Sequence, residues 1–81
     1  MEQYTRSKIS DINPNAIILD GFDEAIIGIS ECGRVIYNID KMIKTLQSDH
    51  NMLPDEAVEY LDFNVLCAHF GDYSPIYLID L

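Results

Sequence analysis

The alternation of apolar and polar positions predicts two adjacent strands near the middle of the chain. Ile, Val and Tyr dominate residues 25–30 and 34–38, and both runs have the length and the β-branched composition of strands. Between them, the stretch Glu31-Cys32-Gly33-Arg34 has the composition of a turn, in which Gly33 supplies the positive φ angle that tight hairpin turns need. We therefore predict a β-hairpin.

The pattern is weaker before this hairpin. Residues 1–15 are polar and show no clear period, so we interpret them as a polar N-terminal arm. The apolar run 16–19 has the length of a further buried strand. It continues into Asp20-Gly21-Phe22-Asp23-Glu24, which we predict to be a turn, because Asp-Gly is a frequent turn pair and an Asp side chain can bind its own local backbone.

The apolar period becomes helical after Asn38. Either Asn38 or Asp40 can accept hydrogen bonds from the free N–H groups at a helix start, and the next apolar residues share one helical face. A second helix is predicted to begin at Pro54, which needs no N–H partner in a first turn, and to end near Gly71. The face-forming residues are Ile39, Met42, Ile43 and Leu46 in the first helix and Ala57, Val58, Leu61, Val65 and Ala68 in the second.

A turn at 72–75 and a strand-like run at 76–80 complete the pattern. Strands followed by helices are typical of an α+β domain. We predict a small antiparallel β-sheet of three or four strands, in the order β-β-(β)-α-α-β, covered on one face by two helices. The last strand is expected to return toward the sheet centre. The expected organisation is the arm at 1–15 and a single α+β domain at 16–81.

The distribution of charge restricts the possible partners of this protein more than its overall composition does. The net charge is −9, and residues 45–81 contain seven Asp or Glu residues and no Lys or Arg. Such a surface repels the phosphate backbone, so direct binding of nucleic acid is not expected, and a basic protein partner fits better. The alternative is that the charge serves only to keep the protein in solution.

Other sequence features predict a cytoplasmic protein without membrane contact. No apolar run reaches the roughly 18 residues that cross a bilayer, and the N-terminal stretch has no apolar signal core. The two cysteines, Cys32 and Cys67, are too few for a disulfide framework, so we expect reduced thiols.

The second predicted helix carries a cluster of acidic residues. Asp55, Glu59 and Asp62 fall at i, i+4 and i+7 on one face, with Glu56 alongside, and no Lys or Arg follows at i+4 to neutralise them. Their Cβ atoms are expected about 5–6 Å apart, which is comparable to the phosphate spacing of a nucleic acid, so the face could imitate DNA toward a basic cleft. The alternative is an ordinary solvated helix face. We take these four residues as the predicted protein-binding site.

The same helix becomes apolar on nearly all sides after Asp62. A helix of this kind in so small a domain is typical of a subunit interface. We therefore predict a homodimer, with an interface that comprises Phe63, Leu66 and Phe70.

Motifs for catalysis or metal binding are not convincing. An EF-hand loop needs glycine at its sixth position, whereas the loop that starts at Asp20 has glycine at its second. Cys67 and His69 are zinc-ligand types, with Cys32 and His50 elsewhere, but residues two apart on a helix point to different sides. We predict no catalytic residue, cofactor or metal, and we do not expect an enzyme. The remaining alternative of this class is a small metal-dependent enzyme that uses Cys67 and His69.

Three stretches taken together resemble a known group of proteins. They are AIILDGFDEAIIGI, RVIYNIDKMIKTL and DEAVEYLDFNVLCAHFGDYSPIYL, and they span about residues 16–79. The combination is similar to a family of small, acidic, uncharacterised proteins encoded by tailed bacteriophages, which share a DGFDEAIIG-like segment and an EA-EY-FN helix. The chain departs from this pattern at Asn38, where relatives carry aspartate, and at residues 67–69, where they carry Gly-Ala-Tyr. The resemblance implies a phage source and a role in the host cell, and it implies no particular activity.

The function we expect is that of a non-enzymatic accessory protein, encoded by a phage, which binds a host or phage protein. The partner would be basic, and the protein would inhibit it by electrostatic and steric occlusion. The alternative from a different class is a self-assembling structural protein in which the apolar end of the second helix makes an oligomer.

Overall fold

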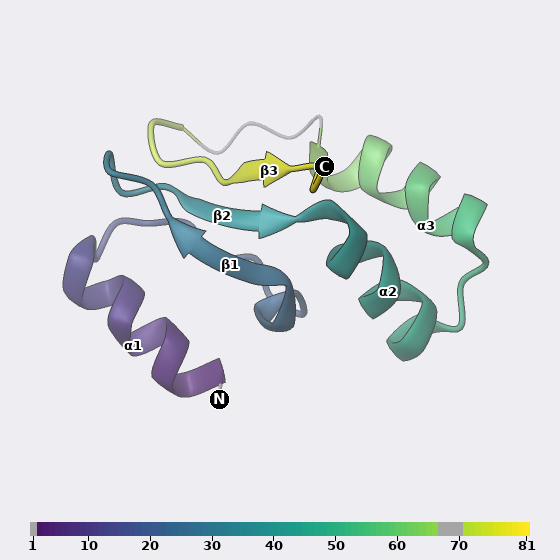
Figure 1. The fold of residues 1–81 in the computed structure, drawn as a ribbon, viewed down its shortest axis with the longest axis horizontal. Helices are drawn as coiled ribbons and strands as arrows, with labels where there is room; N and C mark the ends of the chain where they lie inside the picture. The colour runs from purple at the N-terminus through teal and green to yellow at the C-terminus, as the bar shows by residue number, and fades with distance from the viewer. Residues whose placement is uncertain (1, 67–70) are drawn as a thin grey trace.

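The computed structural model describes the backbone of residues 2–66 and 71–81 and the side chains of residues 5–65 and 71–81. The chain forms the predicted α+β fold (Figure 1). In chain order its elements are α1 (Glu2–Ile12), the 3₁₀ turn η1 (Asp23–Ala25), β1 (Ile26–Ile29), β2 (Val35–Asn38), α2 (Ile39–His50), α3 (Pro54–Leu61), the π-helical turn η2 (Asp62–Leu66) and β3 (Ile76–Leu78).

β1 and β2 form the predicted hairpin. They are antiparallel, with Ile29 opposite Val35. The Ser30 N–H donates to the Arg34 carbonyl over 2.7 Å, and the Gly33 N–H donates to the Ser30 carbonyl over 2.9 Å. Gly33 has a φ of +90°, a left-handed conformation that a residue with a side chain adopts only with strain.

The third strand makes the sheet mixed, so the prediction of an antiparallel sheet is wrong for this pair. β3 runs parallel to β2, with Ile36 opposite Ile76. The strand order β1-β2-β3 also places β3 at an edge and not at the centre. The connection explains the direction: the chain leaves β2 through α2 and α3, and a crossover of that length brings it back to start a parallel strand.

Residues 16–19 do not form a strand. The Leu19 N–H donates to the side-chain oxygen of Tyr37 over 2.7 Å, so a side chain takes the place of a neighbouring strand as its partner. Ala16, Ile18 and Leu19 still pack against the core, which accounts for their apolar character. The run is a buried extended segment that leads into η1.

α2 begins and packs as predicted. The Asn38 side chain accepts a hydrogen bond from the Lys41 N–H over 3.0 Å, and this caps the helix start. Met42 and Leu46 are buried on the predicted face. Asn51, which follows the last helical residue His50, has a left-handed φ of +54° and caps the helix end.

α3 begins at Pro54, as predicted, and the Glu56 carboxylate accepts from the Leu53 N–H over 2.9 Å at this helix start. The residues that face the core are Ala57, Leu61 and Val65.

Val58 was predicted in this stripe, but it is 44% exposed, because it lies about 100° around the helix axis from Ala57. The predicted stripe residue Ala68 and the predicted helix end before Gly71 involve residues outside the described ranges. The turn that follows is present: the Ser74 N–H donates to the Gly71 carbonyl over 3.2 Å.

Residues 2–12 form a helix within the segment 1–15 that the sequence indicated to be a polar arm. α1 lies along β1, on the side away from β2 (Figure 1). Ile9 is the buried residue of this helix among its described side chains, at 4% exposure, and one buried position produces no detectable period. The helix is followed by Asn13, whose side-chain amide donates to the Gly33 carbonyl over 3.0 Å.

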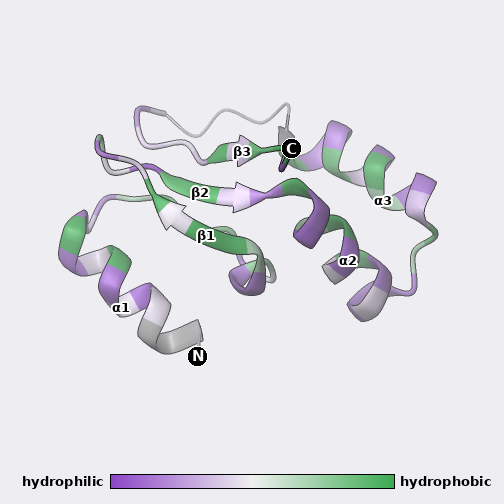
Figure 2. Cartoon of the chain, viewed as in Figure 1, coloured by the Kyte–Doolittle hydropathy of each residue, from purple (hydrophilic) through white to green (hydrophobic). Residues whose placement is uncertain are grey.

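The core lies where the sheet meets the helices. Tyr37, Met42, Leu61 and Val35 are the largest fully buried side chains. Figure 2 shows hydrophobic colouring along the strands and alternating hydrophobic and hydrophilic colouring along α2 and α3, as expected for helices with one buried side. No helix in the described ranges is long and apolar enough to cross a bilayer.

Candidate protein-binding surface

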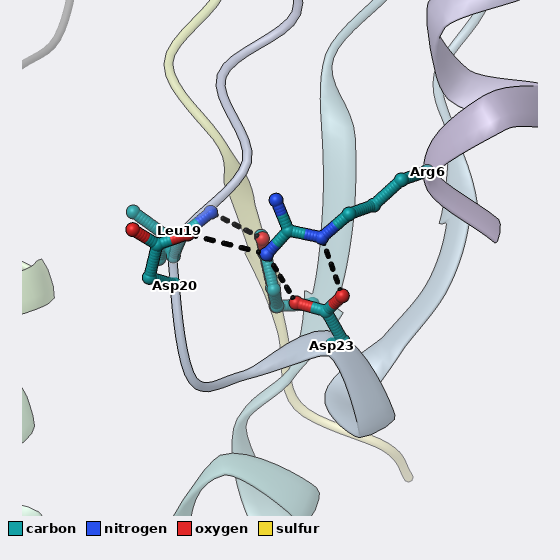
Figure 3. A network of polar contacts seen from close by, with 5 residues as sticks. Arg6, Leu19, Asp20 and Asp23 are labelled. Atoms are coloured by element: carbon teal, nitrogen blue, oxygen red, sulfur yellow. Dashed lines mark hydrogen bonds and ion pairs between the residues drawn. The ribbon is translucent and has the colours of Figure 1, made fainter. Parts of the chain in front are cut away.

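The acidic stretch at residues 20–24 is a turn that is tied to α1. The Arg6 guanidinium donates from Nε to Asp23 Oδ2 over 2.6 Å and from Nη2 to Asp23 Oδ1 over 2.7 Å, and Nη2 also lies 3.2 Å from Asp20 Oδ1 (Figure 3). Gly21 has a φ of +88° between the two aspartates, as expected for the predicted turn. Hydrogen bonding to Asp23 raises the pKa of Arg6 above its ordinary value, which keeps this pair charged.

Tyr37 fixes the other end of this turn. Its hydroxyl accepts the Leu19 N–H, one residue before Asp20. The Tyr37 ring is fully buried, and it stacks on Tyr77 with ring centroids 6.4 Å apart. Burial raises the pKa of Tyr37 to about 12. The turn therefore has a structural role, because its polar groups are directed at α1 and β2.

The four acidic residues predicted on α3 and at its end are all exposed to solvent. Asp55, Glu59 and Asp62 lie on the outer side of the helix, opposite the buried residues Ala57 and Leu61. Among the described side chains, both ion pairs involve Arg6, and neither reaches α3. The negative charge of this face therefore remains available at the surface.

Glu56 differs from the other three acidic residues. Its carboxylate accepts the Leu53 N–H at the helix start, so part of its hydrogen-bonding capacity is used in the first turn of α3. A carboxylate at this position is also stabilised by the positive end of the helix dipole. We therefore assign Glu56 first to helix capping and only second to the surface.

Large apolar side chains are exposed around these acids. Phe63 is 82% exposed, and Val58 and Tyr60 are 44% and 40% exposed at the two flanks of the acidic face. Together with Asp55, Glu59 and Asp62 they form what we call the acidic–aromatic surface. Phe63 is the most exposed aromatic side chain among the described residues, and an exposed apolar patch with a polar rim is typical of an interaction site.

The π-helical turn η2 places Phe63 on this surface. Val65 is buried in continuation of the Ala57 and Leu61 face, so Phe63, two residues after Leu61, must point outward. The Asn64 side-chain amide donates to the Tyr60 carbonyl over 3.1 Å and takes up a backbone acceptor. π-Helical turns of this kind occur frequently at functional sites.

The basic side chains lie on other elements. Arg34 donates from Nε to the Ser74 carbonyl over 2.7 Å, so this guanidinium holds the hairpin to the segment before β3. Lys41 and Lys44 of α2 line a hollow together with Glu24 and other polar residues near η1. The acidic–aromatic surface therefore contains no basic side chain of its own.

The residues considered for zinc do not form a site in the described part of the chain. Cys32 is exposed in the hairpin turn, and His50 is exposed in the last turn of α2. No group of three or more potential metal ligands occurs among the described residues. Cys67 and His69 lie outside the described ranges, as does Phe70 of the predicted oligomer interface. Leu66 belongs to η2, but its side chain is not described.

Comparison with protein families, curated proteins and solved structures finds no match for this chain. The sequence predicted the four acids as a binding site and Phe63 as part of an oligomer interface, and it did not predict the exposure of Val58 and Tyr60. The exposure of Val58 and Tyr60 could have been predicted only from their positions on the helical wheel, at the flanks of the acidic stripe.

Proposed function

We propose that this protein is a non-enzymatic binding module whose acidic–aromatic surface binds a basic region of another protein. The observation that carries the proposal is the 82% exposure of Phe63, which directly follows Asp62 at the end of the acidic face. Exposed aromatic side chains are enriched at binding hot spots, where they fill a pocket of the partner. The surrounding carboxylates then form the polar rim of the contact.

The acids and the aromatic residue have separate tasks in this proposal. Long-range attraction by Asp55, Glu59 and Asp62, in a chain of net charge −9, raises the rate at which a basic partner is encountered. Burial of Phe63 slows dissociation, because an anchor residue contributes mainly after docking. The surface would then block the basic region of the partner against its usual ligand.

The resemblance to phage proteins and the negative charge suggest the biological setting. We propose that the chain is a phage-encoded accessory protein that acts in the cytoplasm of the host. Its target would be a host or phage protein with a basic cleft, of the kind that binds nucleic acid. The spacing of the acidic residues supports imitation of a phosphate backbone, and Phe63 supports recognition of a protein surface in addition.

The test is a capture experiment with two triple variants that have the same change in charge. The first variant is Asp55→Asn, Glu59→Gln and Asp62→Asn. The matched control is Asp11→Asn, Glu31→Gln and Asp72→Asn, which also neutralises two aspartates and one glutamate at exposed positions away from α3. Tagged proteins are incubated with host lysate at low and high salt, and the retained proteins are identified by mass spectrometry.

We expect the control to retain the same basic protein as the wild type at low salt and to release it at high salt. The α3 variant should lose it at both salt concentrations, and Phe63→Ala should shorten the lifetime of the complex. Equal losses in the two triple variants would mean that only net charge matters, and the assignment of the site to α3 would be wrong.

The exposure of Phe63 also favours a second candidate, which is self-assembly through the same surface. The two candidate functions predict opposite effects of the α3 triple variant on the strength of association. Removal of negative charge from a surface that meets its own copy relieves repulsion and strengthens assembly, whereas it weakens binding to a basic partner. Light scattering over a range of protein concentrations measures the first effect, and the capture experiment measures the second.

A further inference from the structure

α1 is attached to the hairpin at both ends of β1. Near the start of the helix, Arg6 binds Asp23, which lies just before β1. After its end, the Asn13 amide donates to the carbonyl of Gly33, which lies in the turn after β1. The helix therefore runs beside the strand as a strap that is held at two points.

A groove lies between the strap and the strand. It has a volume of about 400 Å³, and its walls are mainly isoleucine side chains. α1 contributes Thr5, Lys8, Ile9 and Ile12, and β1 contributes Ile26, Ile27, Gly28 and Ile29. Ile12 and Ile27 are 59% and 43% exposed, so the groove is open to solvent.

One side of this groove is an open sheet edge. β1 pairs with β2 and, among the described strands, with no other. Because the Ser30 N–H bonds to the carbonyl of Arg34, the neighbouring pair of Ile29 and Val35 is not hydrogen-bonded, and the N–H and C=O of Ile29 point away from β2. Ile26 pairs with Tyr37 and Gly28 pairs with Ile36, so Ile27 lies at the register shift between these two pairs. A free edge of this kind is a template for another strand.

Gly28 leaves part of this edge without a side chain. It lies in the middle of β1, where a β-branched residue would favour the strand, and a Cβ atom at this position would meet nothing within 4 Å. Neither a positive φ nor a steric clash requires glycine here. Glycine inside a strand marks a bulge, such as the register shift between Ile26 and Gly28, or a place where another backbone approaches closely, and the open space at Gly28 permits such an approach.

We infer that this groove binds an extended segment of another protein, which adds to the sheet as a strand beside β1. The backbone of the occupant would bond to Ile29, and its apolar side chains, at alternate positions, would lie against the isoleucines of α1 and β1. The lining is apolar apart from Thr5 and Lys8, and the net charge of −9 repels acidic segments, so the segment carries apolar and uncharged side chains. This chemistry differs from that of the basic partner proposed for α3, and the two surfaces are independent.

A second copy of the chain is a poorer occupant. Its own β1 carries α1 along the same edge, so two copies cannot bring their β1 edges together without displacing a strap. Each copy also has a net charge of −9, which opposes association.

The first experiment measures amide hydrogen exchange by NMR, with and without a blocked, uncharged peptide of alternating valine and threonine. In the free protein, the Ile29 amide should exchange faster than the Gly28 amide, which lies in the hydrogen-bonded pair with Ile36. At a peptide concentration of ten times Kd, exchange at Ile29 should slow about elevenfold, since only the free form is open. The same peptide with N-methyl groups along one edge should not bind, because it lacks the donors that pair with β1.

Two variants keep the test specific. Gly28→Val should weaken peptide binding at least tenfold while the midpoint of thermal unfolding stays the same or rises, because the side chain enters the groove without a clash. Ile12→Lys should weaken binding, and Val58→Lys, a substitution at a comparably exposed position on α3, should not.

Several outcomes would overturn the inference. They are no binding of the peptide, equal binding of its N-methylated form, or protection of Ile29 in the free protein. Protection of Ile29 that increases with protein concentration and without peptide would identify a second copy as the occupant instead.

Discussion

Arg6 and Asp23, seventeen residues apart in the sequence, join α1 to the start of the hairpin through two parallel hydrogen bonds from one guanidinium to one carboxylate. The carboxylate is 10% exposed and the guanidinium 38%. Paired hydrogen bonds of this geometry are stronger than an ordinary surface ion pair, although the partial exposure of Arg6 reduces their contribution. Together with the Asn13–Gly33 hydrogen bond and the buried Ile9 side chain, this pair holds α1 against the hairpin.

The first prediction follows from this pair. Arg6→Ala should lower the free energy of unfolding by about 1–2 kcal/mol, because it leaves a mostly buried carboxylate without its partner. Arg6→Lys should recover only part of the loss, since an ammonium group cannot donate two parallel bonds. Urea unfolding measures both values, with Lys44→Ala as the control for loss of an exposed cation. Identical stability of Arg6→Lys and the wild type would show that charge alone holds α1.

The second prediction concerns the two stacked tyrosines, which should respond in opposite directions to the same substitution. Tyr37→Phe removes the acceptor of the Leu19 N–H and should lower the free energy of unfolding by about 1–2 kcal/mol. Tyr77→Phe removes a buried hydroxyl that has no partner among the described residues, and it should raise stability by up to about 1 kcal/mol. Thermal or urea unfolding of the two variants checks the signs. A loss of stability in Tyr77→Phe would mean that its hydroxyl has a partner.

The third prediction is a loss of stability in alkaline solution. Burial raises the pKa of Tyr37 to about 12, above its ordinary value of about 10, and burial also raises the pKa of Tyr77. Between pH values of about 10 and about 12, Tyr37 has released its hydroxyl proton in the unfolded chain but retains it in the folded chain. The unfolded state therefore binds fewer protons, and the free energy of unfolding falls as pH rises from about 10 to about 12.

Urea unfolding at several pH values from about 8 to about 12 measures this slope. Tyr37→Phe should make the slope shallower than in the wild type. The control is Tyr60→Phe, which changes an exposed tyrosine of α3. An unchanged slope in Tyr37→Phe would assign the alkaline transition to other groups.

The fourth prediction compares two glycines of the hairpin. Gly28→Val should raise the free energy of unfolding by about 0.5–1 kcal/mol, because valine favours a strand and space is available. Gly33→Val should lower it by about 1–3 kcal/mol, since φ is +90° and a Cβ atom would lie 2.5 Å from the Asn13 side-chain nitrogen. Circular dichroism during heating gives both midpoints. A Gly28→Val protein less stable than the wild type would show that this glycine serves the fold rather than the groove.

Several parts of the fold follow from local sequence alone. The Asn38 cap, the Pro54 start of α3 and the positive φ of Gly33 depend on residues within a few positions, so their chemistry can be read from the chain. The helical period that buries Met42 and Leu46 is local in the same sense. The acidic stripe of α3 was predicted for this reason, because neighbours on one helix face are fixed by spacing.

Other features depend on partners that are distant in sequence. In its described part α1 has a single buried side chain, Ile9, and its attachment depends on Asp23 and Gly33. No local sequence pattern therefore predicts this helix. The parallel direction of β3 was decided by the path of the crossover, which an apolar run at 76–80 does not specify. The apolar run at 16–19 looks like a strand, yet Tyr37 takes its backbone donor.

The candidate sites divide in the same way. The sequence by itself determined the charge, the helical caps and the order of carboxylates on α3, because each of these is set by composition or by spacing along one element. Only the tertiary structure decided which apolar residues remain exposed beside them and that α1 lies next to an open strand edge. Exposure and edges are properties of packing, and packing is set by contacts between elements that the order of residues does not reveal locally.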